Sequence, residues 1–224
     1  MFILLLLGFW LGSAMGQQPH VAIGDILCSD GSTLRRENWS GASAEKTPIG
    51  IVFYVERKEG VWHGWALNLN ESERIFWADN GYSNRNFNTP ITDKAAAVSD
   101  TLGIANTNTV FALLSGTELT EWNYPAYHYI EGLRATDTRW YLPALGQLNY
   151  LYAQIPEINL TVDVLNSVAP NTAKRIEGDA DGTFSYWPST EYNEGFIWYL
   201  NYDGGCAQTG DKSAYRRARA VRSF

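Results

Sequence analysis

Short apolar runs of β-branched and aromatic residues mark the strands expected in the first third of the chain. Residues 49–55 and 61–69 form two such runs, and the stretch 56–60 between them is mostly charged. Two runs of this length on either side of a short polar segment predict a β-hairpin. An earlier strand is expected at 23–27, because the composition of 29–31, Ser-Asp-Gly, favours a turn.

Helical periodicity appears in the middle of the chain. Thr92 and Asp93 can cap a helix over 94–98, and the apolar positions of 124–133 recur near helical spacing. A single apolar stripe is formed by Leu145, Leu148, Leu151 and Tyr152. Pro156 is expected to end this helix, because proline lacks a backbone donor and clashes with the preceding turn.

The remaining segments complete the expected order of elements. Residues 78–90 are polar and rich in Asn, which predicts an irregular surface loop. From Glu177 onward, Gly, Asp, aromatic residues and short β-prone runs predict strands and long loops. Strands, then helices, then strands indicate an α+β fold with antiparallel sheets and two or three helices, in which both ends of the chain share one sheet.

The N-terminus has the pattern of a secretory signal. An apolar run at 2–11 is followed by small residues up to Gly16, although no Lys or Arg precedes the run. The run is shorter than the roughly 20 apolar residues that span a bilayer. We therefore expect Met1 to Gly16 to be removed and residues 17–224 to form one exported domain, secreted or at the cell surface, with no transmembrane span. Cys28 lies too far beyond the cleavage point to carry a lipid anchor.

Composition narrows the function classes. The chain contains 9 Trp and 13 Tyr, and only 18% of its residues are charged, so it is a folded domain rich in ring contacts. The formal net charge of −7 disfavours non-specific binding of nucleic acid, which requires a surplus of Lys and Arg. The local exception is the basic segment 212–222, whose arginines we expect to form salt bridges and hydrogen bonds to the closing sheet.

The last forty residues combine rigid rings with short polar groups, as binding loops do. We interpret this region as a recognition surface for a protein or a glycan. The candidate ligand contacts are Tyr192, Asn193, Phe196, Tyr199, Asn201, Tyr202, Asp203, Gln208 and Tyr215. For its four tyrosines, packing and ligand contact are equally compatible with the sequence. The expected core residues of the region are Trp187, Trp198 and Phe224.

Several segments together resemble a known family. They are Tyr124-Pro-Ala126, Trp140-Tyr-Leu-Pro143, Gln147-Leu-Asn-Tyr-Leu-Tyr152, Tyr186-Trp-Pro-Ser-Thr-Glu191 and Arg219-Ala-Val-Arg-Ser-Phe224. They resemble the Lcl-type C-terminal domain, or major paralogous domain, of bacterial surface proteins. The resemblance implies a C-type-lectin-like fold, similar to that of the formylglycine-generating enzymes. Two departures are Pro188, where the family usually has Ser, and His128, near a position where many members have Cys.

The interval 191–217 also resembles the variable region of proteins diversified by retroelements. Adenine-directed mutagenesis of Asn codons yields residue types such as Gly, Phe, Tyr, Cys, Ala, Thr, Asp and Ser, and those types crowd this interval. The resemblance implies a fixed framework that carries changeable side chains. In that case Cys206 arises from diversification; otherwise it is available for one disulfide with Cys28, or both thiols are free.

The sequence gives little support for a metal site or a catalytic site. Residues 177–188 imitate the first half of a calcium loop, but the twelfth position is Pro188, so a polar turn is favoured over a structural calcium. We expect no other cofactor and no catalytic residue, since His20, His63 and His128 are isolated and no nucleophile has a base nearby in sequence.

The leading hypothesis is a non-enzymatic recognition protein that acts in bacterial surface adhesion or in phage attachment. The first alternative is an assembly subunit of a surface fibre, with the aromatic face buried against a sister protein. A third is an oxidase or hydrolase on the same scaffold.

Overall fold

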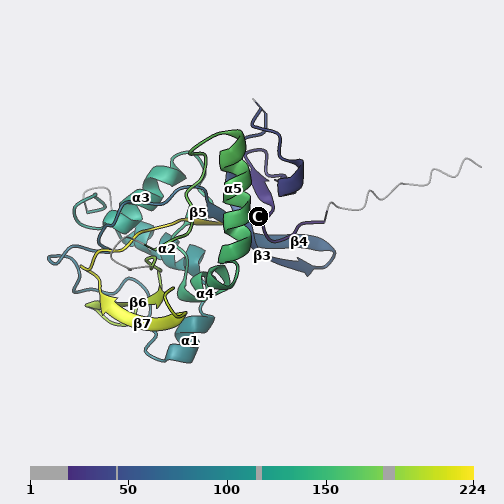
Figure 1. Ribbon diagram of the computed structural model, residues 1–224. Helices are drawn as coiled ribbons and strands as arrows, with labels where there is room; N and C mark the ends of the chain where they lie inside the picture. The colour runs from purple at the N-terminus through teal and green to yellow at the C-terminus, as the bar shows by residue number, and fades with distance from the viewer. Residues whose placement is uncertain (1–19, 44, 115–117, 179–184) are drawn as a thin grey trace, which may run out of the picture.

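The computed structural model describes residues 20–43, 45–114, 118–178 and 185–224. A six-stranded antiparallel sheet has the order β2-β1-β3-β4-β8-β5. Its strands are β1 (Ile26–Cys28), β2 (Thr33–Leu34), β3 (Pro48–Lys58), β4 (Val61–Asn68), β5 (Trp140–Tyr141) and β8 (Val221–Ser223). A separate hairpin consists of β6 (Phe196–Asn201) and β7 (Cys206–Asp211), at the lower left of Figure 1. The α+β prediction is confirmed, and the first and last of the described strands lie in one sheet, as predicted.

Five α-helices and one short 3-10 helix accompany the described strands. They are η1 (Arg36–Asn38), α1 (Lys94–Ser99), α2 (Gly103–Leu113), α3 (Pro125–Arg134), α4 (Leu145–Ala153) and α5 (Ile155–Val168). The predicted cap of α1 is confirmed, because a carboxylate oxygen of Asp93 accepts a hydrogen bond of 2.8 Å from the backbone N–H of Ala96. Helices α3 and α4 confirm the two other predicted helices.

The role assigned to Pro156 needs a correction, and two helices were missed. Pro156 lies in the first turn of α5, where the missing N–H is harmless, and α4 already ends at Ala153. Helix α5 is apolar enough to bury Ile158, Val162 and Leu165 in the core. Helix α2 has a weak signal because Asn and Thr have low helix propensity.

The β3–β4 hairpin provides the centre of the sheet. Its turn is formed by Glu59 and Gly60, both with positive φ (50° and 85°), which suits the twist of a two-residue hairpin turn. Side chains alternate along β3, so that Ile51 and Phe53 contribute to the cluster beneath α4 and α5 while Val52 contributes to the opposite face. Figure 1 shows α5 lying across the sheet beside β3 and β4.

The remaining sequence predictions concern the N-terminal signal, the calcium-like loop, the loop at 78–90 and membrane spanning. The proposed signal segment and residues 179–184, which are half of the calcium-like loop, lie outside the described residues. Residues 78–90 contain no helix or strand, as expected of an irregular loop. Within the described ranges, no helix combines the length and apolar character needed to cross a membrane.

Candidate functional site

The β6–β7 hairpin holds most of the predicted ligand contacts. Its backbone is anchored by buried side chains of β6, because Ile197, Trp198 and Leu200 are all at most 5% exposed. The indole N–H of Trp198 donates a 2.6 Å hydrogen bond to the carbonyl of Ile91. Trp187 is also fully buried, so the core assignment of both tryptophans is confirmed. Phe224, which was also predicted to be a core residue, is only half-buried and packs at the edge of the cluster on the far face of the sheet.

A buried ion pair joins the residue that precedes the hairpin to the residue that follows it. Lys212 Nζ lies 2.6 Å from Glu191 Oε2, and both side chains are 0% exposed. Glu191 Oε1 accepts hydrogen bonds from the backbone N–H groups of Phe87 and Asn88, at 3.0 and 2.9 Å. The ammonium of Lys212 also donates to the carbonyl of Arg85 at 2.7 Å. Burial lowers the pKa of Lys212, and the Glu191 carboxylate opposes that shift.

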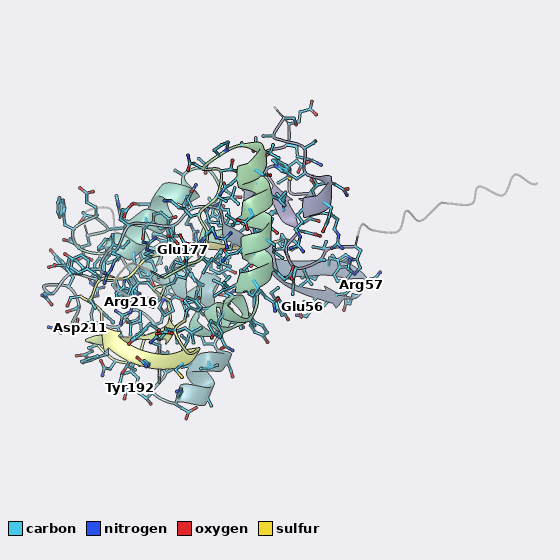
Figure 2. The ribbon with its side chains drawn as sticks, viewed as in Figure 1. Glu56, Arg57, Glu177, Tyr192, Asp211 and Arg216 are labelled. Carbon is cyan, nitrogen blue, oxygen red and sulfur yellow. The ribbon has the colours of Figure 1, made fainter. Side chains whose placement is uncertain are left out.

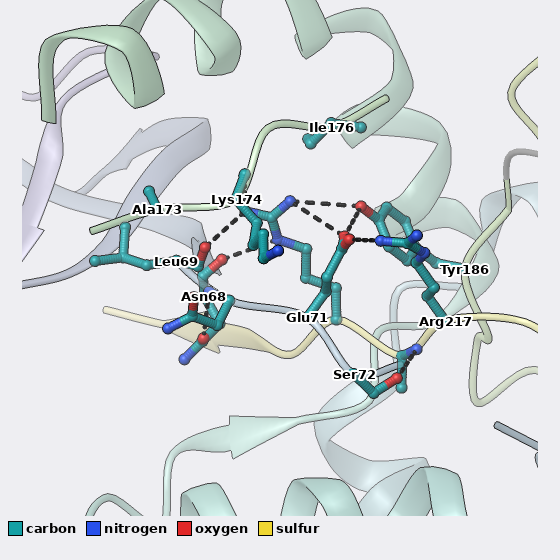
Figure 3. Close-up of polar contacts among 12 residues, drawn as sticks. Asn68, Leu69, Glu71, Ser72, Ala173, Lys174, Ile176, Tyr186 and Arg217 are labelled. Atoms are coloured by element: carbon teal, nitrogen blue, oxygen red, sulfur yellow. Dashed lines mark hydrogen bonds and ion pairs between the residues drawn. The ribbon is translucent and has the colours of Figure 1, made fainter. Parts of the chain in front are cut away.

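The closing arginines make structural contacts, as predicted. Arg217 forms an ion pair with Glu71, whose other carboxylate oxygen accepts a 2.5 Å hydrogen bond from the Tyr186 hydroxyl (Figure 3). Burial raises the pKa of Tyr186 well above its ordinary value. Arg222 pairs with Asp137 at 2.7 Å. The basic C-terminus is therefore largely used by the fold itself.

Arg219 is the most deeply engaged of these arginines. Its side chain is 0% exposed and lies 3.6 Å from Glu71. The guanidinium donates to the backbone carbonyls of Asn68, Leu69 and Lys174, at 3.0, 3.2 and 2.8 Å. Figure 3 shows how these contacts join the end of β4 to the segment that follows α5. A fork of N–H donors is required here, which Arg provides and Lys does not.

Arg216 lies between two rings and shapes the hairpin surface. Its guanidinium carbon is 3.7 Å from the ring centroid of Tyr199 and 4.8 Å from that of Trp187. Burial lowers the pKa of Arg216. These contacts are cation–π interactions, and they hold the Tyr199 ring against the protein. Figure 2 shows Arg216 and Asp211 on the side of the molecule opposite Glu56 and Arg57 at the tip of the β3–β4 hairpin.

Seven of the nine predicted ligand contacts lie on or beside the hairpin with some exposure. We call these side chains, which lie on both sides of the two-stranded sheet, the hairpin face: Tyr192, Asn193, Phe196, Tyr199, Asn201, Asp203 and Gln208. Phe196 is 46% exposed. The Tyr199 hydroxyl donates a 2.6 Å hydrogen bond to Gln208 Oε1 on the neighbouring strand. The Tyr192 ring is edge-on to Trp198, at 5.4 Å between centroids. Side chains of the hairpin face are therefore positioned by contacts with their neighbours.

Tyr202 belongs to the core, which corrects its place among the ligand contacts. Its side chain is only 4% exposed and stacks on Tyr152 at 5.5 Å between centroids. It also meets Tyr186 edge-on at 5.7 Å. Its position directly after β6 turns the ring inward, a direction that the sequence pattern did not reveal.

Tyr215 is separated from the hairpin face. Its ring is 55% exposed and its centroid lies 4.2 Å from that of Phe76. Both rings line a groove of about 460 Å³ that also includes Trp122, which is 75% exposed. Phe76 and Trp122 were not among the contacts predicted from the sequence. Neither residue carries a local sequence signal for a ligand site, because the groove is formed by segments that are far apart in the chain.

Substitution of the two tyrosines should affect stability to different extents. Tyr202→Leu is expected to lower the free energy of unfolding by about 1 to 2 kcal/mol, because it removes a buried ring stack and leaves space in the core. Tyr215→Leu, at an exposed position, should change it by no more than about 0.5 kcal/mol. Urea denaturation followed by circular dichroism measures both. Equal losses would contradict the core placement of Tyr202.

Neither the cysteines nor the histidines assemble into a site. Cys28 and Cys206 are not bonded to each other; the first is buried and the second exposed. The three histidines are all exposed. Among the described residues, no group of three or more His, Cys, Asp or Glu side chains is placed to hold a metal ion.

The thiols should differ in reactivity. Burial raises the pKa of Cys28 and shields its sulfur, so little nucleophilic thiolate is available there. In the native protein, Ellman's reagent is expected to titrate one thiol quickly, at Cys206, and the second only after unfolding. Two fast thiols would show that Cys28 is accessible, and none would show that the pair is oxidised.

Comparison with solved structures shows that this fold occurs in a known protein. No protein-family model and no curated protein sequence matches this chain. A solved structure of a fimbrial protein from Bacteroides ovatus superposes on 92% of the chain with a TM-score of 0.63 and 16% sequence identity. The chain spans 49% of the length of that protein. At this identity, the similarity concerns the fold.

Proposed function

We propose that this chain is an exported, non-enzymatic subunit of a surface fibre. The observation that carries the proposal is the superposition of nearly the whole chain on part of a fimbrial protein. Because that protein is about twice as long, the fold accounts for one portion of such a subunit. The expected secretory signal at Met1 to Gly16 agrees with export.

The rigid C-terminal framework supports an assembly role. The Glu191–Lys212 pair and the Glu71 network hold the hairpin and the closing segment in one conformation. A preorganised surface loses little conformational entropy when a partner covers it. The hairpin face offers partners an exposed ring, Phe196, on one side of the two-stranded sheet and exposed polar groups such as Gln208 on the other.

Shear fractionation tests this role. A chromosomal epitope-tagged copy would be followed in the organism that carries the gene, before and after mechanical shearing of intact cells. We expect the tagged chain in the sheared high-molecular-weight fraction, together with at least one sister subunit. Recovery only from the cytosol would exclude a fibre subunit.

A second candidate function is ligand recognition by the hairpin face. It is favoured by the exposure of Phe196, Asn193 and Gln208 over a backbone anchored by buried residues, the arrangement in which contact side chains can change without unfolding the domain. The ligand would be a protein or a glycan. Combined replacement of Phe196 and Gln208 by Ala should abolish ligand binding and leave the thermal midpoint within a few degrees; unchanged binding would eliminate this surface.

The resemblance to the Lcl-type domain and to retroelement-diversified proteins extends this second candidate. If both resemblances hold, the C-type-lectin-like framework includes Trp187 and the closing segment, and the changeable positions lie in 191–217. Sequencing the locus across many isolates tests the idea. Substitutions confined to Asn-type codons in that interval would support diversification, and uniform variation would reject it.

A further inference from the structure

Three aromatic side chains from distant segments converge on one groove, which we call the aromatic groove. Phe76 and Tyr215 form a tilted ring pair, with centroids 4.2 Å apart and planes at 41°. Trp122 lines the same groove and is 75% exposed. A tryptophan this exposed contributes little to folding, because most of its apolar surface stays in water.

The aromatic groove is built on fixed backbone. Ile75 and Arg216 exchange two backbone hydrogen bonds, at 2.8 and 3.1 Å, which set the Phe76 segment against the Tyr215 segment. The N–H of Asp79 donates to the carbonyl of Asn123 at 3.0 Å, which ties the Trp122 turn to the same wall. The rings are thus presented at defined positions before any ligand arrives.

The polar lining indicates the charge and chemistry of the ligand. Asp79, Glu121 and Asn123 supply oxygen acceptors and an amide, and Arg74 supplies the cation of the lining. Two carboxylates against one guanidinium disfavour an anionic ligand. A neutral molecule with many hydroxyl donors suits this lining, provided that it also has an apolar C–H face to pack on the rings.

A peptide strand fits this groove less well than a compact ring. Added strands bind mainly through free backbone groups at a sheet edge. Here the N–H groups of Ile75, Trp77 and Asp79 already donate to other parts of the chain. The volume of about 460 Å³ lies within the range of about 300 to 1,000 Å³ typical of small-ligand sites.

We propose that the aromatic groove binds a neutral pyranose unit of a glycan. The C–H face of the sugar packs on Trp122 and the Phe76–Tyr215 pair, and its hydroxyls donate to Asp79 and Glu121. The proposal goes beyond fibre assembly, and its site is distinct from the hairpin face. It would make the subunit an adhesin as well as a structural component.

Methyl glycosides of glucose, galactose, mannose and N-acetylglucosamine are the probes. Saturation-transfer NMR on the full mature chain should show binding of at least one of them, and calorimetry should give its affinity. Trp122→Ala is expected to weaken binding at least tenfold with an unchanged thermal midpoint. Leu160→Ala, which removes a side chain that is 50% exposed on α5, is the matched control and should bind as the unmodified chain does.

Glu121→Gln is a second variant that keeps the shape of the groove. A several-fold loss with Glu121→Gln and full retention with the control would support the assignment even if Trp122→Ala folded poorly. Absence of binding to all four glycosides, or equal binding by Trp122→Ala and the unmodified chain, would overturn it.

The fibre proposal is tested separately from the glycan proposal. Trp122→Ala should still enter the sheared fibre fraction. If the unmodified chain enters fibres but binds no glycoside, only the glycan-binding proposal is rejected. If it binds glycosides but never reaches the sheared surface fraction, only the fibre role is rejected.

Discussion

Replacement of Lys212 by Met is expected to lower the free energy of unfolding by about 3 to 5 kcal/mol. The Glu191 carboxylate would then be buried without its ammonium partner. Removing one member of a buried ion pair typically lowers the free energy of unfolding by this amount. The carbonyl of Arg85 would also lose its donor. Urea denaturation at neutral pH, followed by tryptophan fluorescence, measures the change.

An exposed pair provides the control. Arg175 and Asp163 form an ion pair whose side chains are 41% and 54% exposed. Arg175→Met should therefore lower the free energy of unfolding by no more than about 1 kcal/mol. If Lys212→Met were as mild as Arg175→Met, the buried pair would not be what fixes the hairpin.

Replacement of Arg219 by Leu is expected to lower the free energy of unfolding by at least about 3 kcal/mol. The carbonyls of Asn68 and Lys174 would lose the guanidinium donor, whereas the Leu69 carbonyl would still accept from the Lys174 N–H. The nearby buried Glu71 carboxylate would also lose this counter-charge. A buried polar group left without a partner is unfavourable by about 1 to 3 kcal/mol. Arg219→Lys should recover only part of the loss, because an ammonium cannot reproduce the planar fork. Chemical denaturation of the three forms measures this order.

Arg57→Leu is the comparison for a surface arginine. Arg57 is exposed at the end of β3, donates to the Gly60 carbonyl at 3.3 Å and lies over the Trp62 ring. Its loss should change the free energy of unfolding by about 1 kcal/mol or less. A larger loss with Arg57→Leu than with Arg219→Leu would contradict the account of the closing segment.

The elements that local chemistry specifies were predictable from sequence. The β3–β4 hairpin, the Asp93 cap and the apolar stripe of α4 each depend on residues close together in the chain, and all three predictions are confirmed. The structural role of the C-terminal arginines was also predictable, since alternating Arg residues in a closing strand usually bond to the sheet.

What the sequence left open depends on tertiary contacts. Helix α2 is poor in strong helix formers and forms where its buried face meets the core. The same limit applies to the site, because Tyr215 is exposed and Tyr202 is buried although both belong to the same aromatic and polar C-terminal region. Trp122 became a candidate only when folding brought it beside Phe76 and Tyr215.

Immunogold electron microscopy of intact cells tests the central claim most directly. Antibody raised against the purified mature chain would be applied to the organism that carries the gene and to a deletion strain. The fibre account predicts gold particles on filaments that project from the cell, and none on the deletion strain. Gold confined to the cell interior, or filaments without label, would contradict it.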